Sequence, residues 1–188
     1  MKTEPTRHVM VDIETLDTEP TAVVLSAAVG EFFTCPNGTF DIGETREWVL
    51  PITPQIEVGR TISGKTLEWW AGQRPEIFQS AISKGGDEAE LEMCIQALDS
   101  FIRRSNFWGN GATFDNVIMR HLMRTYIDPD QLWKYRQDRC YRTIQATFDP
   151  GRRLKPKRKN AHRALDDVLF QIQYLKEIND VYHIFRRQ

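Results

Sequence analysis

Residues 8–16 read HVMVDIETL, a strand-like apolar run that ends in two carboxylates, Asp12 and Glu14. Side chains alternate between the faces of a strand, so Asp12 and Glu14 project together while Val11 and Ile13 take the other side. Two carboxylates on one face repel each other, and such oxygen-rich pairs are what Mg²⁺ and Mn²⁺ accept. The pair is therefore a candidate metal site, but taken alone the pattern favours a solvated strand end, and further carboxylates are needed to support metal binding.

A second carboxylate context lies in the middle of the chain. Residues 107–111 read FWGNG, a short apolar run ending in glycines, and residues 112–115 read ATFD. Apolar residues then recur at helical spacing from Val117 onward, which places Asp115 in the first turn of a helix that follows a strand. Taken alone, Asp115 is better explained as a favourable charge at a helix N-terminus.

A third context lies near the C-terminus, where residues 160–168 read NAHRALDDV. This segment runs into a predicted helix with an apolar face. The residues of that face are Leu165, Val168, Leu169, Ile172 and Leu175. His162 and Asp167 are five residues apart, so the two side chains converge only if His162 lies on the loop before the helix.

The segments 12–15, 110–115 and 162–167 resemble, in order and spacing, the three exonuclease motifs of the DEDDh 3′-5′ exonucleases. Residues 62–77, which include Trp69 and Trp70, resemble the small stand-alone exoribonuclease branch known from mycobacteria and bacteriophages. The resemblance implies an α/β, ribonuclease H-like fold with a mixed five-stranded sheet flanked by helices. It covers nearly the whole chain and implies a single DEDDh exonuclease domain over residues 1–188.

The same resemblance implies roles for five residues. Asp12 bridges two ions, Mg²⁺ or Mn²⁺, while Glu14 and Asp167 complete the shell of the ion that carries the attacking water. Asp115 supports the second ion, and His162 is the general base that takes the proton from the water. These roles describe a two-metal hydrolysis that releases nucleoside 5′-monophosphates.

Two points qualify the match. Residues 139–143 read RCYRT, so Cys140 stands where the branch tends to have a carboxylate, which bears on substrate placement and not on the chemistry. Asp166 and Asp167 are adjacent and point about 100° apart on a helix, and the family spacing selects Asp167.

The substrate contacts are predicted from several separate features of the sequence. Leu16 stands where the family places an apolar residue against the terminal base, although a core role is the alternative. One of two adjacent tryptophans packs inward while the other offers a ring for base stacking. The basic run 152–159 is either a solvated loop or a flap that contacts phosphates. The predicted substrate-binding residues are Thr15, Leu16, Trp69, Trp70, Asn110, Phe114, Arg158 and Lys159.

The composition of the chain bears on how it can bind nucleic acid and on the compartment in which we expect it. The chain has 188 residues, 25 Lys and Arg against 26 Asp and Glu, and three widely spaced cysteines. A net charge near zero means that affinity for nucleic acid must come from local patches. No apolar leader and no run of about 20 apolar residues is visible, so we expect a soluble cytoplasmic protein with no membrane contact. A homodimer is left open.

The expected order of elements is three strands, then helices, then alternating strands and helices. Strands are expected at residues 8–14, 22–33 and 47–52 as an antiparallel meander with a turn at 36–38. A helix is expected at 87–104, followed by a short buried strand at 107–108 parallel to the first strand.

We therefore predict a metal-dependent 3′-5′ exonuclease that acts on single-stranded nucleic acid with a free 3′ end, with RNA favoured over DNA. The alternatives are an endonuclease on the same sheet and a non-catalytic nucleic-acid-binding or interaction domain that retains the fold.

Overall fold

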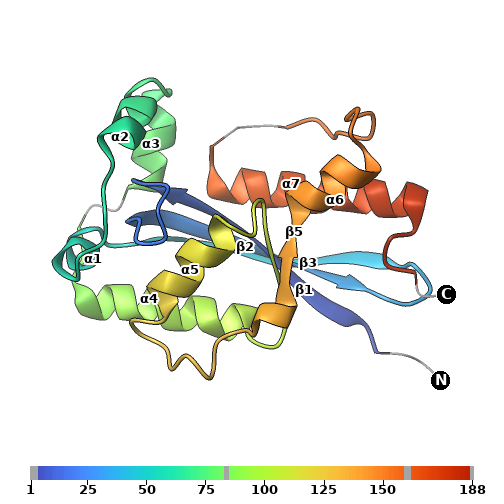
Figure 1. The fold of residues 1–188 in the computed structure, drawn as a ribbon, viewed down its shortest axis with the longest axis horizontal. Coiled ribbons are helices and arrows are strands. Elements are labelled where there is room, and N and C mark those ends of the chain that lie inside the picture. The colour runs from blue at the N-terminus through green and yellow to red at the C-terminus, as the bar shows by residue number, and fades with distance from the viewer. Residues whose placement is uncertain (1–3, 83–84, 159–161, 187–188) are drawn as a thin grey trace.

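The computed structural model describes residues 4–82, 85–158 and 162–186, which form a mixed five-stranded sheet between two layers of helices (Figure 1). The strand order is β3-β2-β1-β4-β5, so β1 is central. The strands are β1 (Thr6–Thr15), β2 (Val24–Thr34), β3 (Phe40–Val49), β4 (Asn106–Gly109) and β5 (Asp138–Cys140). This architecture confirms the predicted fold class.

The antiparallel pairing of the first three strands and the parallel pairing of β1 with β4 confirm the prediction, whereas the pairing of β4 with β5 was not predicted. β1 pairs with β2 and β2 with β3 in antiparallel fashion, whereas β1 pairs with β4 and β4 with β5 in parallel fashion. The prediction for the third strand was wrong, because β3 covers residues 40–49 instead of 47–52. β3 is an edge strand with a largely exposed, polar central portion, so it lacks the apolar run by which a buried strand is recognised.

Helices α4 (Glu88–Ile102) and α5 (Asp115–Met123) cover one face of the sheet (Figure 1). Asp87, just before α4, accepts a hydrogen bond from the Glu90 N–H at 2.9 Å and so caps the helix that was expected at 87–104. The apolar face of α4 packs in one cluster with β1 residues Val9, Val11 and Ile13. The odd-numbered residues of this part of β1 therefore belong to the α4 side.

Helices α6 (Tyr141–Phe148) and α7 (Ala164–Tyr182) lie on the opposite face (Figure 1). Here Met10 of β1 packs in one cluster with Val168 and Ile172 of α7. Gly30 on β2 lets α7 approach closely, since a Cβ at this position would lie 2.6 Å from Ile172 Cδ1 and 2.7 Å from Val168 Cγ1. This close approach brings the first turn of α7 to the even-numbered face of β1.

Three short helices, α1 (Thr53–Glu57), α2 (Gly64–Ala71) and α3 (Pro75–Ala81), gather near the end of β1 (Figure 1). The Trp70 Nε1–H donates to the Thr15 carbonyl at 2.9 Å and ties α2 to that strand end. A 3₁₀ turn, Tyr135–Gln137, precedes β5. Among the described residues, no helix combines the length and the apolar character needed to cross a membrane.

Candidate active site

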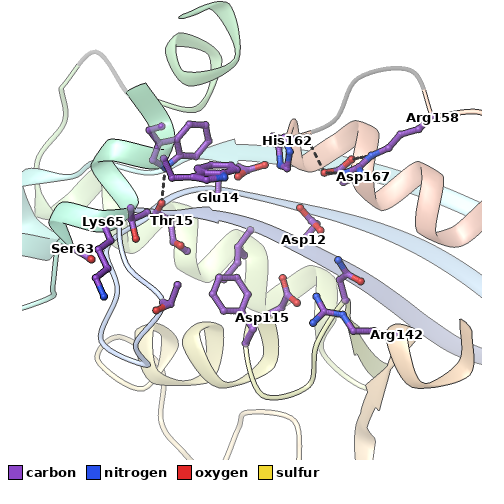
Figure 2. Close-up of a pocket in the computed structure, with 17 residues that line it drawn as sticks. Asp12, Glu14, Thr15, Ser63, Lys65, Asp115, Arg142, Arg158, His162 and Asp167 are labelled. Atoms are coloured by element: carbon purple, nitrogen blue, oxygen red, sulfur yellow. Dashed lines mark hydrogen bonds and ion pairs between the residues drawn. The ribbon is translucent and has the colours of Figure 1, made fainter. Parts of the chain in front are cut away.

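Three buried carboxylates meet where β1 faces the start of α7 (Figure 2). Asp12 and Glu14 alternate with the core residues Val11 and Ile13, as the strand pattern predicted. One carboxylate oxygen from each of Asp12, Glu14 and Asp167 lies within 4.8 Å of the other two. The three residues are only 8%, 7% and 4% exposed, so water screens their charges poorly.

Asp115 lines the same cavity from α5 (Figure 2). Its Oδ2 accepts a hydrogen bond from the Gly111 N–H at 3.0 Å, which fixes the carboxylate at the helix start. The preceding strand needs glycine at position 109, because a Cβ there would lie 2.2 Å from Asn116 Oδ1 and 2.8 Å from Asp115 Cβ. Asp115 is outside the group of three oxygens within 4.8 Å, yet its charge acts on Asp12.

Burial and mutual repulsion shift the acidities of these groups. Burial, followed by the charges of Asp167 and Asp115, raises the pKa of Glu14 to about 8. Burial raises the pKa of Asp115 to about 6, against hydrogen bonds and the Arg142 charge that lower it. Burial and three neighbouring carboxylates also raise the pKa of Asp12 well above its usual range. A bound divalent cation would offset this cost, and the all-oxygen donor set fits Mg²⁺ or Mn²⁺.

Asp167 and Asp166 have different surroundings. Arg158 donates from Nε to Asp167 Oδ1 at 2.8 Å and pairs through Nη2 with Oδ2 at 2.5 Å. The His162 backbone N–H donates to Asp167 Oδ2 at 3.1 Å. Asp166 pairs with Arg163 at 3.9 Å and is not part of the carboxylate group. The structure therefore places Asp167 in the position that the family spacing selected.

His162 lies on the loop before α7, which begins after the N-cap residue Arg163. Its backbone is left-handed, with φ of 64°. Its ring packs edge-on against Trp69, with a centroid distance of 4.9 Å and an interplanar angle of 86°. His162 lines the cavity together with the four carboxylates, so the loop position required for convergence with Asp167 is observed.

The carboxylate cavity, with a volume of about 620 Å³, extends from the acidic residues toward α2. Most of the predicted substrate-binding residues line it, namely Thr15, Trp69, Trp70, Asn110, Phe114 and Arg158. Lys159 lies outside the described residues. Of the two tryptophans, Trp70 is 2% exposed and packs inward, whereas Trp69 is 42% exposed and presents its ring beside His162.

The structure corrects the prediction for Leu16. Its side chain is 5% exposed and packs with Val23, Leu25 and Trp70 in a small core cluster. β1 ends at Thr15, and its register against β2 shifts between Glu14 and Thr15, where Leu25 is the extra residue on β2. Leu16 therefore lies beyond the strand, and the alternation that holds for Asp12 and Glu14 does not extend to it.

Several residues at the site were missed, among them Gln171, Arg142 and the α2-side residues Ser63 and Lys65. Gln171 donates from Nε2 to Asp12 Oδ1 at 2.6 Å and is 3% exposed. It follows Asp167 by four residues on α7, and this spacing is a signal that could have indicated it. Arg142 lines the cavity and lowers the pKa of Asp115. Cys140, the departure from the family pattern, lines a separate surface depression with Gly111 and Thr143.

The sheet order and the two helical layers are those of the ribonuclease H-like fold. Residues 7–179 match the family model described as the 3′-5′ exoribonuclease Rv2179c-like domain. The chain therefore belongs to this family. None of the curated proteins compared with the chain matches it.

Solved structures share the fold. The zinc-bound complex of *E. coli* exonuclease I with single-stranded DNA superposes with a TM-score of 0.64 at 20% identity, covering 97% of this chain and 42% of that chain. *S. pombe* Pop2p in its Mg²⁺- and Mn²⁺-bound form gives a TM-score of 0.61 at 12% identity, covering 96% and 85%. The chain thus spans less than half the length of exonuclease I. These similarities confirm the ribonuclease H-like fold.

Proposed function

We propose that this protein is a metal-dependent exonuclease that removes nucleoside 5′-monophosphates from the free 3′ end of single-stranded nucleic acid, with RNA favoured over DNA. The observation that carries the proposal is the meeting of Asp12, Glu14 and Asp167 within 4.8 Å on a cavity that Asp115 also lines. The family description supports an RNA substrate. The solved complexes of exonuclease I with DNA keep DNA as the second candidate.

The four carboxylates can hold two divalent ions. The chemistry that two such ions supply is activation of a water and stabilisation of the leaving 3′ oxygen. In this assignment Asp12 would be a ligand shared by the two ions, Glu14 and Asp167 would help to hold the ion that carries the water, and Asp115 would support the second ion. The metal-bound form of Pop2p supports Mg²⁺ and Mn²⁺ as candidates.

His162 takes the proton from the attacking water in this proposal. An imidazole exchanges protons near neutral pH, and His162 lines the cavity beside the carboxylates. Its backbone N–H binds Asp167, and its ring packs against Trp69. Closure of the His162 loop over a substrate would therefore act on both the metal site and the stacking surface.

The remaining residues of the cavity would bind the bases and phosphates of the nucleic-acid strand. Trp69 offers its exposed ring to a base, a contact worth roughly 1 to 3 kcal/mol. Thr15, Asn110 and Phe114 line the cavity where the terminal nucleotide would lie. Arg158, together with Lys159, would contact phosphates. The described cysteines are free, which fits action in a reducing cytoplasm.

A nuclease assay tests the proposal directly. Labelled RNA and DNA strands with free and blocked 3′ ends are incubated with Mg²⁺, Mn²⁺ or excess chelator, and the products are resolved by chromatography. We expect mononucleotides from free 3′ ends only, with chelation abolishing the reaction. Undiminished activity in chelator would contradict the metal mechanism. Cleavage of blocked strands would indicate an endonuclease, and binding without turnover would indicate a non-catalytic domain.

A further inference from the structure

A second cavity of about 310 Å³ lies beside the carboxylate cavity, against α6 and α7 and the loop that joins them. Four cationic side chains line it, Arg142, Arg152, Lys155 and Arg158, and none of its described lining residues is acidic. We call it the basic cavity. Arg142 and Arg158 also line the carboxylate cavity, so the two spaces share a wall.

Arg142 lies on α6, whereas the other three cations lie on the loop after α6, in a stretch that is anchored at both ends. At its start, the buried Asp149 carboxylate accepts hydrogen bonds from the N–H groups of Arg153 at 2.8 Å and Leu154 at 2.9 Å. The Tyr174 hydroxyl on α7 donates to the same carboxylate at 2.6 Å. At its end, Arg158 pairs with Asp167. Asp149 is therefore engaged in holding the loop and does not line the basic cavity.

With the loop anchored in this way, the described cations of the basic run form two sets, those that line the basic cavity and those that do not. A backbone hydrogen bond from the Lys155 N–H to the Arg152 carbonyl closes a turn, and both side chains line the basic cavity. Arg153 is exposed and is not among the residues that line this cavity. Lys157 lines a different depression, which includes Asp166. The convergence on the cavity is therefore selective, and not a general property of a charged loop.

The positions of the two cavities indicate the direction in which a bound nucleic-acid strand would run. Trp69 lies on the α2 side of the carboxylate cavity, while Arg142 and Arg158 border the basic cavity. If the terminal base stacks on Trp69 and the scissile phosphate lies at the carboxylates, the next phosphate upstream falls on the Arg142 and Arg158 side. A volume of about 310 Å³ is at the lower end for ligand sites and has room for a phosphate with part of a sugar.

We propose that the basic cavity binds the phosphate immediately upstream of the scissile phosphate. Arginine forks donate two parallel hydrogen bonds to phosphate oxygens, and the lysine adds a point charge. This inference rests on the proposed exonuclease function and adds a length requirement to it. A substrate with one phosphate leaves the basic cavity empty, whereas a substrate with two phosphates fills it.

The test compares two double variants that lose the same charge from the same loop. Arg152→Gln with Lys155→Gln removes two cations from the basic cavity, and Arg153→Gln with Lys157→Gln is the matched control. Each protein is assayed with a dinucleoside monophosphate and with a trinucleoside diphosphate. The ratio of kcat/KM for the longer over the shorter substrate should fall about tenfold or more in the first variant, since charge-assisted contacts are lost. The control should keep the wild-type ratio.

An unchanged ratio in the Arg152→Gln, Lys155→Gln variant, or an equal fall in the control, would overturn the proposal. Competition by a nucleoside 5′-monophosphate and by inorganic phosphate separates the two sources of the anion. If the first variant weakens inhibition by these compounds while the length ratio stays constant, the cavity holds the product phosphate and the strand assignment is wrong. Thermal unfolding verifies that both variants are folded.

Failure of the exonuclease function itself has a different signature. If the wild-type protein cleaves neither substrate, the proposed function fails, and equilibrium binding of the same two oligonucleotides then tests the cavity. Tighter binding of the trinucleoside diphosphate that is lost only in the Arg152→Gln, Lys155→Gln variant supports the cavity without catalysis. Equal binding of both oligonucleotides to all three proteins rejects it.

Discussion

The two ends of β1 bury polar side chains in opposite ways. Near its start, His8 is 4% exposed, stacks on Phe32 and has a partner for each ring nitrogen. Its Nε2 bonds with Thr34 Oγ1 at 2.9 Å, and its Nδ1 accepts from the Trp108 indole at 3.0 Å. These contacts satisfy a neutral imidazole, and burial lowers the pKa of His8 to about 4.

At the other end, Asp12 and Glu14 are equally buried but face further carboxylates. Burial and like charges raise the pKa values of Asp12 and Glu14, whereas burial, followed by the Arg139 charge, lowers the pKa of His8 and keeps its ring neutral. The difference teaches how to separate the two kinds of buried polar group. A group whose hydrogen bonds are complete serves the fold, while a cluster with uncompensated charge is suited to a ligand of opposite charge.

The largest expected effect on turnover comes from neutralising one of the carboxylates that meet at the end of β1. Asp12→Asn or Asp167→Asn should lower turnover by orders of magnitude, because a metal ligand is lost with little change in volume. The metal-free fold should persist or gain stability, since a buried repulsion is relieved. Steady-state kinetics and thermal unfolding measure the two effects.

Asp166→Asn is the control for these substitutions. Asp166 pairs with Arg163 outside the carboxylate group, so its loss should cost far less turnover. If Asp166→Asn proves more damaging than Asp167→Asn, the register of metal ligands on α7 is wrong.

The next effect contrasts two histidines. His162→Ala should lower turnover by roughly 10²- to 10⁴-fold, the range typical of acid–base groups, with metal affinity nearly unchanged. Metal affinity is measured by calorimetric titration with Mn²⁺. A large loss of affinity would make His162 a ligand and would require a different site geometry.

His8→Leu should act on stability instead of chemistry. It leaves the Trp108 indole N–H without its acceptor and the Thr34 hydroxyl without its partner, at a cost of about 1 to 3 kcal/mol for each buried group. Denaturant unfolding should show this loss, while turnover of the folded protein stays near the wild-type value. A variant of wild-type stability with impaired turnover would break the contrast between the two ends of β1.

The smallest effects are in pH dependence, and they have opposite signs at the two ends. His8 binds fewer protons in the folded state between about pH 4 and 6.5, so its contribution to stability is lost as pH falls through that window. Glu14 binds more protons in the folded state between about pH 4.5 and 8, so in chelator its contribution falls as pH rises.

Melting temperatures in chelator from pH 4.5 to 8.5 test these signs. The advantage of Glu14→Gln over the wild type should grow toward high pH, and the deficit of His8→Leu should shrink toward low pH. Mg²⁺ should offset the high-pH loss, because it binds the ionised carboxylates of the folded state. A Glu14→Gln curve parallel to that of the wild type would show that Glu14 is ionised without metal.

Much of the site follows from local rules. Strand alternation placed Asp12 and Glu14 on one face, and helical spacing required the loop position of His162 for convergence with Asp167. The same reasoning could have identified Gln171, because it lies about one helical turn after Asp167 on α7. These relations depend on backbone geometry over a few residues, which the order of residue types already expresses.

Other features needed the packed molecule. Leu16 lies just after the end of β1 and packs into the core cluster of Trp70, and packing of α2 against β1 decided that Trp70 is buried and Trp69 exposed. Because β3 is an edge strand with an exposed, polar central portion, its residues lack the apolar pattern of a buried strand. No local rule predicts these outcomes, because each depends on a contact between segments far apart in the chain.

The amino-acid sequence by itself indicated the class of fold, the four carboxylates and the histidine, because the order and spacing of its three motifs resemble those of a known exonuclease family. Only the tertiary structure decided which cations of the basic run converge beside the site. Arg142 lies on α6, while Arg152 and Lys155 lie on the loop that Asp149 and Tyr174 hold against α7. Convergence of this kind depends on long-range packing, which brings charges together in space without leaving a repeat in the order of residues.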